Sequence, residues 1–148
     1  MTVALGEDVQ AAVDRCPSGG SVLLLPGAHK GPLALGPRVV KNGEGQLALS
    51  ADKEVHVFGR GRATLWAATC SVLTSCAALA TTEGLLLRQD AGNNYTPNPC
   101  VRISGGGLRL QACDVASAQK DSLLAIVHGA DPVVSSCRWG VRASESLP

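Results

Sequence analysis

Two carboxylates and one guanidinium recur in the chain at a single interval. Arg138 follows Asp114 by the same number of residues as Asp114 follows Asp90. If the interval is that of a structural repeat, the three side chains stack on one face, where paired carboxylates beside a base could act on a sugar by acid–base chemistry. A solvated face of a repeat carries the same residue types. We therefore expect Asp90, Asp114 and Arg138 to contact a ligand or partner, and we assign them no catalytic role.

A second candidate contact lies in the longest irregular segment, residues 90–99. It holds Asn94, the only tyrosine of the chain, Tyr95, and two prolines. Binding is commonly built on loops that project from a rigid scaffold. We expect Asn94 and Tyr95 to contact a peptide or a sugar, and the alternative is a plain solvated loop.

Other kinds of site lack the residue spacing that they need. The cysteines include no Cys-x-x-Cys pair, and the three histidines are far apart, so we expect no metal and no cofactor. The chain has neither a Gly-x-Ser-x-Gly nucleophile motif nor a glycine-rich loop that leads into a helix and could hold a phosphate. These gaps favour a protein without catalytic activity. Six cysteines could form three disulfides, but reduced, buried thiols are favoured because an aliphatic core of this size does not need them. The cysteines are at positions 16, 70, 76, 100, 113 and 137.

The composition argues against charged or lipid partners. Thirteen Lys and Arg balance twelve Asp and Glu, so no overall field attracts nucleic acid or an anionic membrane. Arg60 and Arg62 form a modest basic corner, but no aromatic residues alternate with them to stack on bases. The longest uncharged window, 63–82, is too rich in Ser, Thr and Cys to span a membrane. Without a leader at the N-terminus, the expected location is the cytoplasm.

One short helix is predicted at the start of a chain that is otherwise made of strands. Val9, Ala12, Val13 and Cys16 follow the i, i+3, i+4, i+7 pattern of an amphipathic helix, which we place at about 7–16. Pro17 and the glycines after it end the helix. Short apolar stretches, each followed by Gly, Pro, Asn or Asp, then predict an all-β chain. They are 21–25, 32–35, 38–41, 46–49, 54–58, 63–67, 76–79, 84–89, 100–103, 108–115, 123–127 and 132–139.

A constant interval of about two dozen residues relates several positions of the chain and predicts the fold. It pairs Cys76 with Cys100, Leu79 with Ile103, Cys113 with Cys137, Leu110 with Val134 and Val115 with Trp139, while GLLL at 84–87 matches GLRL at 107–110 at nearly the same interval. Units this short must stack to bury their apolar side, which would place the paired cysteines in ladders. We predict one domain, 1–148, folded as a single-stranded right-handed parallel β-helix of about five coils over about 21–142, with a short C-terminal tail. A leucine-rich repeat is the rival, but only residues 108–115 fit its pattern.

Two segments resemble known proteins. DVQAAVD at 8–14 with GGSVLLLPG at 19–27 resembles the helix cap and first coil of pectate-lyase-like β-helix proteins. HGADPVVSSC at 128–137 is similar to the coil consensus of the β-helix domains in F-box and SHC-binding proteins. This resemblance implies the fold, but it covers lyases, hydrolases, epimerases and non-enzymatic scaffolds alike. His128-Gly129 is the only partial match to the hydrolase signatures, so we assign no catalytic residue from this resemblance.

Together these patterns predict a non-catalytic scaffold or protein-interaction module that could form one part of a larger assembly. The alternative is a β-helix that binds a carbohydrate or processes a polysaccharide. The last coil, near Trp139, needs a cover because an uncapped β-helix end exposes strand edges, and the short segment from Ser144 onward is too small to provide it. We expect either self-association through that end or a further C-terminal neighbour.

Overall fold

Three parallel sheets form the body of the protein. The computed structural model describes residues 1–41, 43–90, 98–117, 124–126 and 129–141. The six-stranded sheet contains, in spatial order, β1 (Thr2–Val3), β2 (Gly20–Leu24), β7 (Val55–Gly59), β10 (Ala80–Glu83), β13 (Leu108–Gln111) and β16 (Val133–Ser135). The five-stranded sheet contains β3 (Gly27–Lys30), β8 (Ala63–Ala67), β11 (Leu86–Gln89), β14 (Asp114–Ser117) and β17 (Arg138–Val141). The four-stranded sheet contains β4 (Leu33–Leu35), β9 (Leu73–Ser75), β12 (Val101–Ile103) and β15 (Leu124–Ile126).

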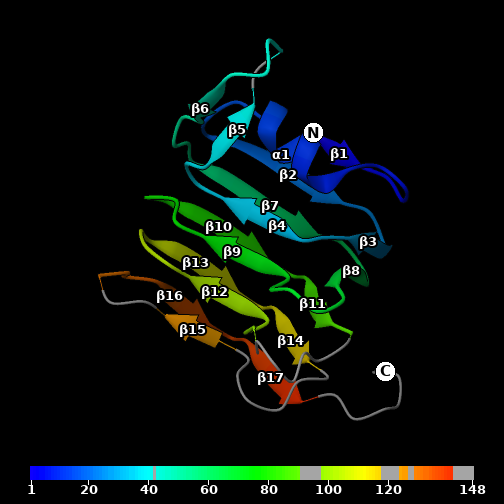
Figure 1. The fold of residues 1–148 in the computed structure, drawn as a ribbon. Coiled ribbons are helices and arrows are strands. Elements are labelled where there is room, and N and C mark those ends of the chain that lie inside the picture. The colour runs from blue at the N-terminus through cyan, green and yellow to red at the C-terminus, as the bar shows by residue number, and fades with distance from the viewer. Residues whose placement is uncertain (42, 91–97, 118–123, 127–128, 142–148) are drawn as a thin grey trace.

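The chain visits the three sheets in turn. Each full coil gives one strand to the six-stranded, one to the five-stranded and one to the four-stranded sheet, and equivalent strands of successive coils pair in parallel (Figure 1). This stacking is the arrangement of a β-helix or a related solenoid, and the described residues contain a single helix, α1 (Val9–Arg15). The predicted all-β class is confirmed. Three strands per coil do not match a leucine-rich repeat, which has one strand per repeat followed by a helix or a 3₁₀ segment.

Alternation along the strands fills the interior with aliphatic side chains. In the six-stranded sheet, Val22, Val57, Thr82 and Leu110 stand in register and are all buried. The parallel strands lie about 4.8 Å apart, so each row of inward side chains is in continuous contact along the coils. Short coils leave little room for aromatic rings, which explains why the chain has so few of them.

The helix and the first strand cover the N-terminal end of the solenoid. Asp8 caps α1 by accepting a hydrogen bond from the backbone N–H of Ala11, at 3.1 Å. Val9, Ala12 and Val13 are buried on the coil below, and β1 pairs with β2. The prediction of a helix at about 7–16 is therefore confirmed, with slightly shorter bounds. We call α1 and β1 the N-terminal cap.

A hairpin interrupts the coils soon after the cap. Strands β5 (Val39–Lys41) and β6 (Leu47–Leu49) pair with each other in antiparallel register and belong to none of the three parallel sheets. The insertion makes the step from Leu33 to its stacked equivalent Leu73 much longer than the next two steps in that sheet, which lead to Val101 and then to Leu124. The predicted strands at 38–41 and 46–49 exist, but they lie outside the solenoid.

The predicted interval of about two dozen residues relates the last two coils. To a close approximation it also relates β7 to β10, β8 to β11 and β12 to β15, whereas the other steps between coils are longer. In the last two coils it relates Leu110 to Val134, and the flanking pairs place Cys137 at the position equivalent to Cys113. The predicted ladder of Cys76 and Cys100 is wrong, because Ile103 pairs with Ser75 and this coil is longer than the predicted interval. The pairing of Leu79 with Ile103 fails for the same reason. Hydrogen bonding between strands fixes the register, and connections of unequal length shift the sequence interval.

Two further details of the repeat prediction are corrected. The segments GLLL and GLRL are not equivalent, because the first leads into β11 of the five-stranded sheet and the second into β13 of the six-stranded sheet. The predicted strand at 76–79 falls between β9 and β10. Both errors follow from matching apolar residues without knowing to which sheet each short strand belongs.

All six cysteines are free thiols, but they are not all buried. Cys16, Cys100 and Cys113 are buried, whereas Cys70 and Cys76 are exposed, which corrects the expectation that they line the interior. Burial raises the pKa of the Cys100 thiol to about 12 and that of Cys113 to about 11. These two thiols therefore stay protonated and serve as packing groups.

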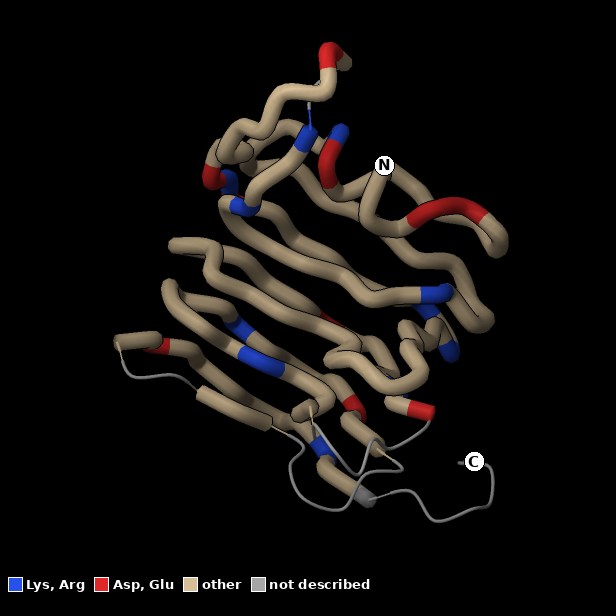
Figure 2. Tube along the Cα trace, viewed as in Figure 1, with Lys and Arg blue, Asp and Glu red and all other residues tan. Residues whose placement is uncertain are grey.

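Charged residues are spread over the coils and over the cap (Figure 2). Among the helices that the structure describes, none is long and apolar enough to cross a membrane. The predicted C-terminal tail at 142–148 lies outside the described residues.

Candidate functional site

The outer face of the five-stranded sheet brings side chains from four coils into one row. Thr64, Leu86, Asp114 and Arg138 are stacked in register on β8, β11, β14 and β17. The alternate residues of the first three strands, among them Leu87, point into the core. Alternation on each strand therefore places this row on the outer face of the sheet, although Thr64 is only 8% exposed there.

Two ion pairs fix the orientation of two arginine side chains on this face. Arg138 donates from Nε to Asp114 Oδ1 at 2.8 Å and from Nη2 to Oδ2 at 2.7 Å. Arg88, on β11, donates from Nε to Asp90 Oδ1 at 2.6 Å and from Nη2 to Oδ2 at 3.3 Å. Both contacts are two-pronged, which fixes the plane of each guanidinium.

The pairing keeps Asp114 ionised. Hydrogen bonds from Arg138 lower the pKa of the Asp114 carboxyl, and the opposing effect of burial is smaller. The same hydrogen bonds raise the pKa of Arg138. Asp114 is therefore unsuited to act as a general acid, which must hold a proton near neutral pH.

A groove runs beside this row, with a volume of about 480 Å³. We call it the arginine groove, because three of its side chains are arginines and one is a carboxylate. A smaller hollow of about 230 Å³ shares Leu86, Asp114 and Arg138 with it and adds Trp139. The arginine groove is lined by Gly61, Arg62, Ala63, Thr64, Gly84, Leu85, Leu86, Arg88, Ala112, Asp114 and Arg138.

The structure brings only part of the predicted contact set together. Asp114 and Arg138 form one ion pair on the groove, whereas Asp90 does not stack on Asp114, because the residue in register with Asp114 is Leu86. Asp90 follows the end of β11 and is bound to Arg88. Asn94 and Tyr95 lie outside the described residues. That these residues contact a ligand stays a prediction.

Sequence reasoning misses Arg88 and Thr64 and gives Arg62 a different setting. The sequence places Arg62 only in a basic corner, although it lines the groove. The signal that could have found Arg88 is the alternation along β11, in which Leu87 and Gln89 are buried. It places Arg88 on the same outward face as Asp114.

The groove can hold a ligand, but its residues do not form a recognisable catalytic set. Among the residues that the structure describes, one carboxylate lines it, and that group is bound to Arg138. Within the described parts of the chain, no cluster of three His, Cys, Asp or Glu could hold a metal ion. Guanidinium N–H groups and the Thr64 hydroxyl are instead suited to bind anionic or hydroxyl-rich groups.

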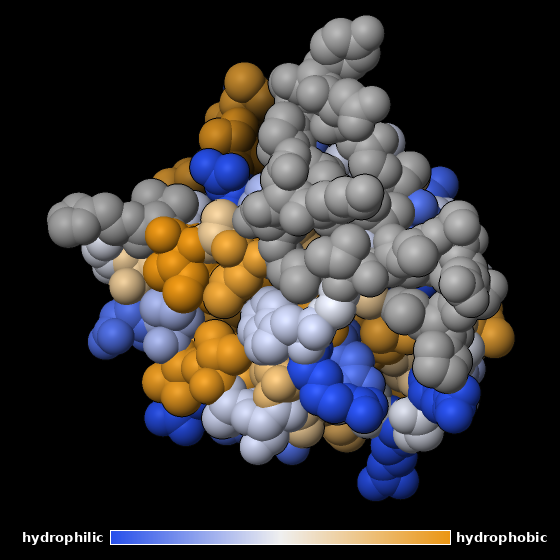
Figure 3. Space-filling model, turned by 90° about the horizontal axis from the view of Figure 1, so that it is seen from below, coloured by the Kyte–Doolittle hydropathy of each residue, from blue (hydrophilic) through white to orange (hydrophobic). Residues whose placement is uncertain are grey.

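A different kind of surface lies at the far end of the solenoid, where β15, β16 and β17 are the last strands that the structure describes in their sheets. We call it the open end. Ile103 is 0% exposed, but its equivalent one coil further, Ile126, is 51% exposed. Likewise Val115 is 2% exposed and its equivalent Trp139 is 39% exposed. Figure 3 shows apolar side chains gathered on the part of this face that is not grey.

No family model matches the chain, and neither the curated proteins nor the solved structures contain a significant match. The function must therefore be inferred from the geometry of the arginine groove and of the open end.

Proposed function

We propose that this chain is a non-catalytic β-helix module that binds another protein through its open end, and that the bound protein is a second copy of the chain. One observation carries the proposal. The rows of inward side chains that are buried in the preceding coils reach the open end and are exposed there, at Ile126, Val134 and Trp139. Apolar side chains exposed at the end of a solenoid favour association with another chain.

The N-terminal cap favours a symmetric dimer over a head-to-tail polymer. A head-to-tail contact would require the open end of one copy to meet the first coil of the next, but α1 and β1 cover that coil. Two open ends related by a twofold axis meet with their edge strands antiparallel, and each copy covers the exposed apolar side chains of the other. Such a contact produces a dimer and leaves no open end for a third copy.

The finer fold assignment belongs to the same proposal. We take the solenoid to be a right-handed parallel β-helix of the pectate-lyase-like type. It is supported by the three parallel sheets, by the capping helix and by the general preference of parallel crossovers for the right hand. A reducing compartment such as the cytoplasm is supported by the six free thiols.

The test is the mass of the protein in solution as a function of concentration. We expect analytical ultracentrifugation to show a monomer–dimer equilibrium, and Val134→Lys to shift it to monomer, because the lysine would be buried against the partner. Val39→Lys is the matched control, since Val39 is exposed on the hairpin at the other end of the molecule. A mass that stays monomeric at every concentration, or equal disruption by both variants, would overturn the proposal.

A second candidate function, binding of an anionic or neutral glycan, is favoured by the arginine groove. The groove offers arginines and the Thr64 hydroxyl in one site. We expect a glycan array to give binders, and Arg138→Ala to weaken their binding by about tenfold or more. Arg102→Ala is the control, because Arg102 is exposed on β12 of a different sheet. An array without binders, with and without added calcium, would exclude this candidate.

A further inference from the structure

A cavity of about 330 Å³ lies where the hairpin is inserted, between α1, β4 and the chain that leads into β7. It is at the small end of the range for ligand pockets, about 300–1000 Å³. The insertion creates the space, because β5 leaves the coil after β4 and the chain returns only at β7. The cavity is lined by Val13, Asp14, Ala34, Leu35, Gly36, Arg38, Val40, Ser50, Ala51, Lys53 and Val55.

The walls of this cavity are mainly apolar. Val13, Leu35 and Val55 are buried side chains of the core, and Val40 extends the apolar wall from the hairpin. Val40 and Val39 are neighbours on β5, but only Val40 lines the cavity, whereas Val39 is exposed. The alternation of the strand thus directs one valine inward and the other to solvent.

Three charged side chains and a hydroxyl complete the lining. Arg38 donates from Nη1 to Asp14 Oδ1 at 2.9 Å and from Nη2 to Asp14 Oδ2 at 2.5 Å, and its backbone N–H donates to Ser50 Oγ at 2.9 Å. Lys53 Nζ donates to the carbonyl oxygens of Asp14 and Cys16, at 2.8 and 2.7 Å. Charge is therefore unbalanced, since Arg38 and Lys53 carry two positive charges and Asp14 one negative charge.

The charge of Asp14 is secured by its neighbours. Burial raises the pKa of its carboxyl, but hydrogen bonds from Arg38 and Gln10 outweigh that effect, and the pKa is lowered overall. The lining thus keeps a net positive charge at neutral pH. Its cations retain further N–H groups, because an ammonium has three, a guanidinium has five, and the contacts above use only some of them.

We propose that this cavity binds a small aliphatic monocarboxylate, with its carboxylate at Arg38 and Lys53 and its alkyl chain against Val13, Leu35, Val40 and Val55. An apolar wall with a few converging polar groups is the usual composition of a small-molecule site. One negative charge on the ligand balances the lining. The proposal is independent of the open end and of the arginine groove, neither of which shares a residue with the cavity.

The experiment uses hexanoate as the probe, with hexanol and hexylamine as matched compounds of the same alkyl length. In methyl NMR spectra we expect hexanoate to shift the signals of Val13, Leu35, Val40 and Val55 in a saturable way. Hexanol should bind about tenfold more weakly or worse, and hexylamine should not bind. Absence of saturable shifts with hexanoate, or equal binding of the three compounds, would overturn the proposal.

Two kinds of substitution locate the site. Val40→Phe should fill the cavity and abolish hexanoate binding, whereas Val39→Phe, on the opposite side of the same strand, should leave binding unchanged. Lys53→Gln should weaken hexanoate by about tenfold and leave hexanol unaffected, since it removes a charge and keeps a donor. Loss of binding in Val39→Phe, or full binding in Val40→Phe, would place the ligand elsewhere and refute the proposal. Thermal unfolding of each variant shows whether it is folded.

Discussion

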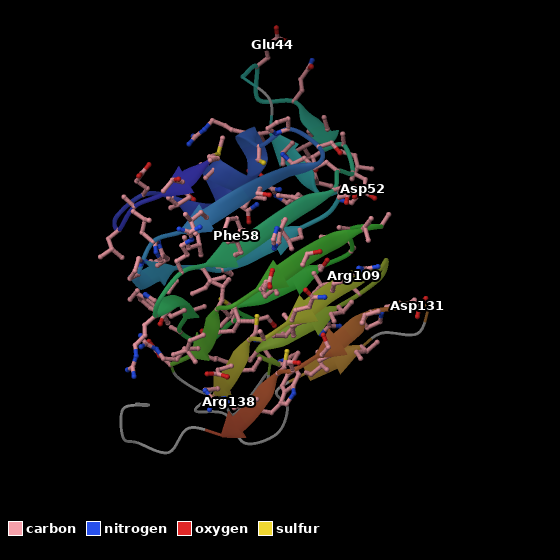
Figure 4. The ribbon with its side chains drawn as sticks, turned by 180° about the vertical axis from the view of Figure 1, so that it is seen from behind. Glu44, Asp52, Phe58, Arg109, Asp131 and Arg138 are labelled. Atoms are coloured by element: carbon pink, nitrogen blue, oxygen red, sulfur yellow. The ribbon has the colours of Figure 1, made fainter. Side chains whose placement is uncertain are left out.

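The two ends of the solenoid differ in whether their apolar side chains are covered. At the N-terminal end, Val13 of the helix and Val3 of β1 cover the first coil and are buried. At the open end, equivalent inward positions carry Val134 and Trp139, which are exposed. The hairpin tip at Glu44 and Arg138 of the last coil mark these opposite ends (Figure 4).

The difference shows that a coil is not self-sufficient. Each coil contacts only the coils directly before and after it. The outer faces of the first and last coils therefore need covers that the repeat does not supply. The N-terminal end has a helix of different character from the coils, with its own capping residue. At the open end, the described residues include no such helix, and an apolar surface is left.

The largest expected effect comes from comparing a buried valine with an exposed valine, each replaced by aspartate. Val9→Asp buries a carboxylate in the N-terminal cap and should lower the free energy of unfolding by at least about 3 kcal/mol. Val133→Asp, at an exposed position of the open end, should change the stability of the monomer by less than about 0.5 kcal/mol. Urea unfolding of dilute samples measures both. Similar losses in the two variants would show that the open end is covered after all.

A second contrast concerns glycines with a positive φ. At Gly36 (φ +100°), a Cβ would lie 2.5 Å from the backbone nitrogen of Ala77, whereas at Gly129 (φ +93°) a Cβ would meet none of the described residues within 4 Å. Gly36→Ala should cost at least about 2 kcal/mol, and Gly129→Ala about 1 kcal/mol, from backbone strain alone. Thermal unfolding distinguishes them. If Gly129→Ala lost more stability than Gly36→Ala, the close approach of the Ala77 backbone to Gly36 would be incorrect.

The helix cap predicts a smaller effect. Asp8→Ala removes the acceptor for the Ala11 N–H and should lower stability by about 1 kcal/mol. Asp131→Ala is the counterpart near the open end, where no side-chain hydrogen bond of Asp131 is found among the described residues, and it should be neutral within about 0.5 kcal/mol. Chemical unfolding at neutral pH compares the two, and a neutral Asp8→Ala would contradict the cap.

The smallest effect is the pH dependence of the ion pairs near the two ends. The pKa values of Asp14 and Asp114 are lowered in the folded protein, so their contributions to stability are present above the ordinary value of 3.8 and are lost as the pH falls through the folded-state pKa. Asp14→Asn should cost about 0.5 kcal/mol at pH 7 and less as the pH falls toward about 2. Asp114→Asn should follow the same direction. Urea midpoints at the two pH values provide the measurement, and a cost that is undiminished in acid would rule out the ion pair as its cause.

The sequence predicts what is local and misses what depends on connection length. The helix follows from Val9, Ala12 and Val13, because a periodic pattern of 3.6 residues is read within one segment. The interval from Asp114 to Arg138 is also correct, because these two residues stack in register in the last two coils. The prediction misplaces Asp90 because the preceding coil is longer, and no local pattern reports how many residues a loop adds to a coil.

The arginine groove is only partly predictable for a related reason. Asp114 and Arg138 could be paired through the repeat, but Arg62, Thr64 and Arg88 join them only after the strands are stacked in the observed register. That register is a property of backbone hydrogen bonds over the whole sheet. The hairpin is likewise visible in the sequence as two strands, but its antiparallel pairing is not, because apolar strand patterns do not identify their partners.

The inserted hairpin closes at its own base, and this makes it separable from the coils. The backbone N–H of Ser50 donates to the carbonyl of Arg38 at 2.8 Å, so the chain leaves and re-enters at one point. The entropy of closing a loop rises only slowly with its length. Residues 39–49 are therefore a natural position for grafting a foreign peptide, which the solenoid would display without any change to the stacking of its sheets.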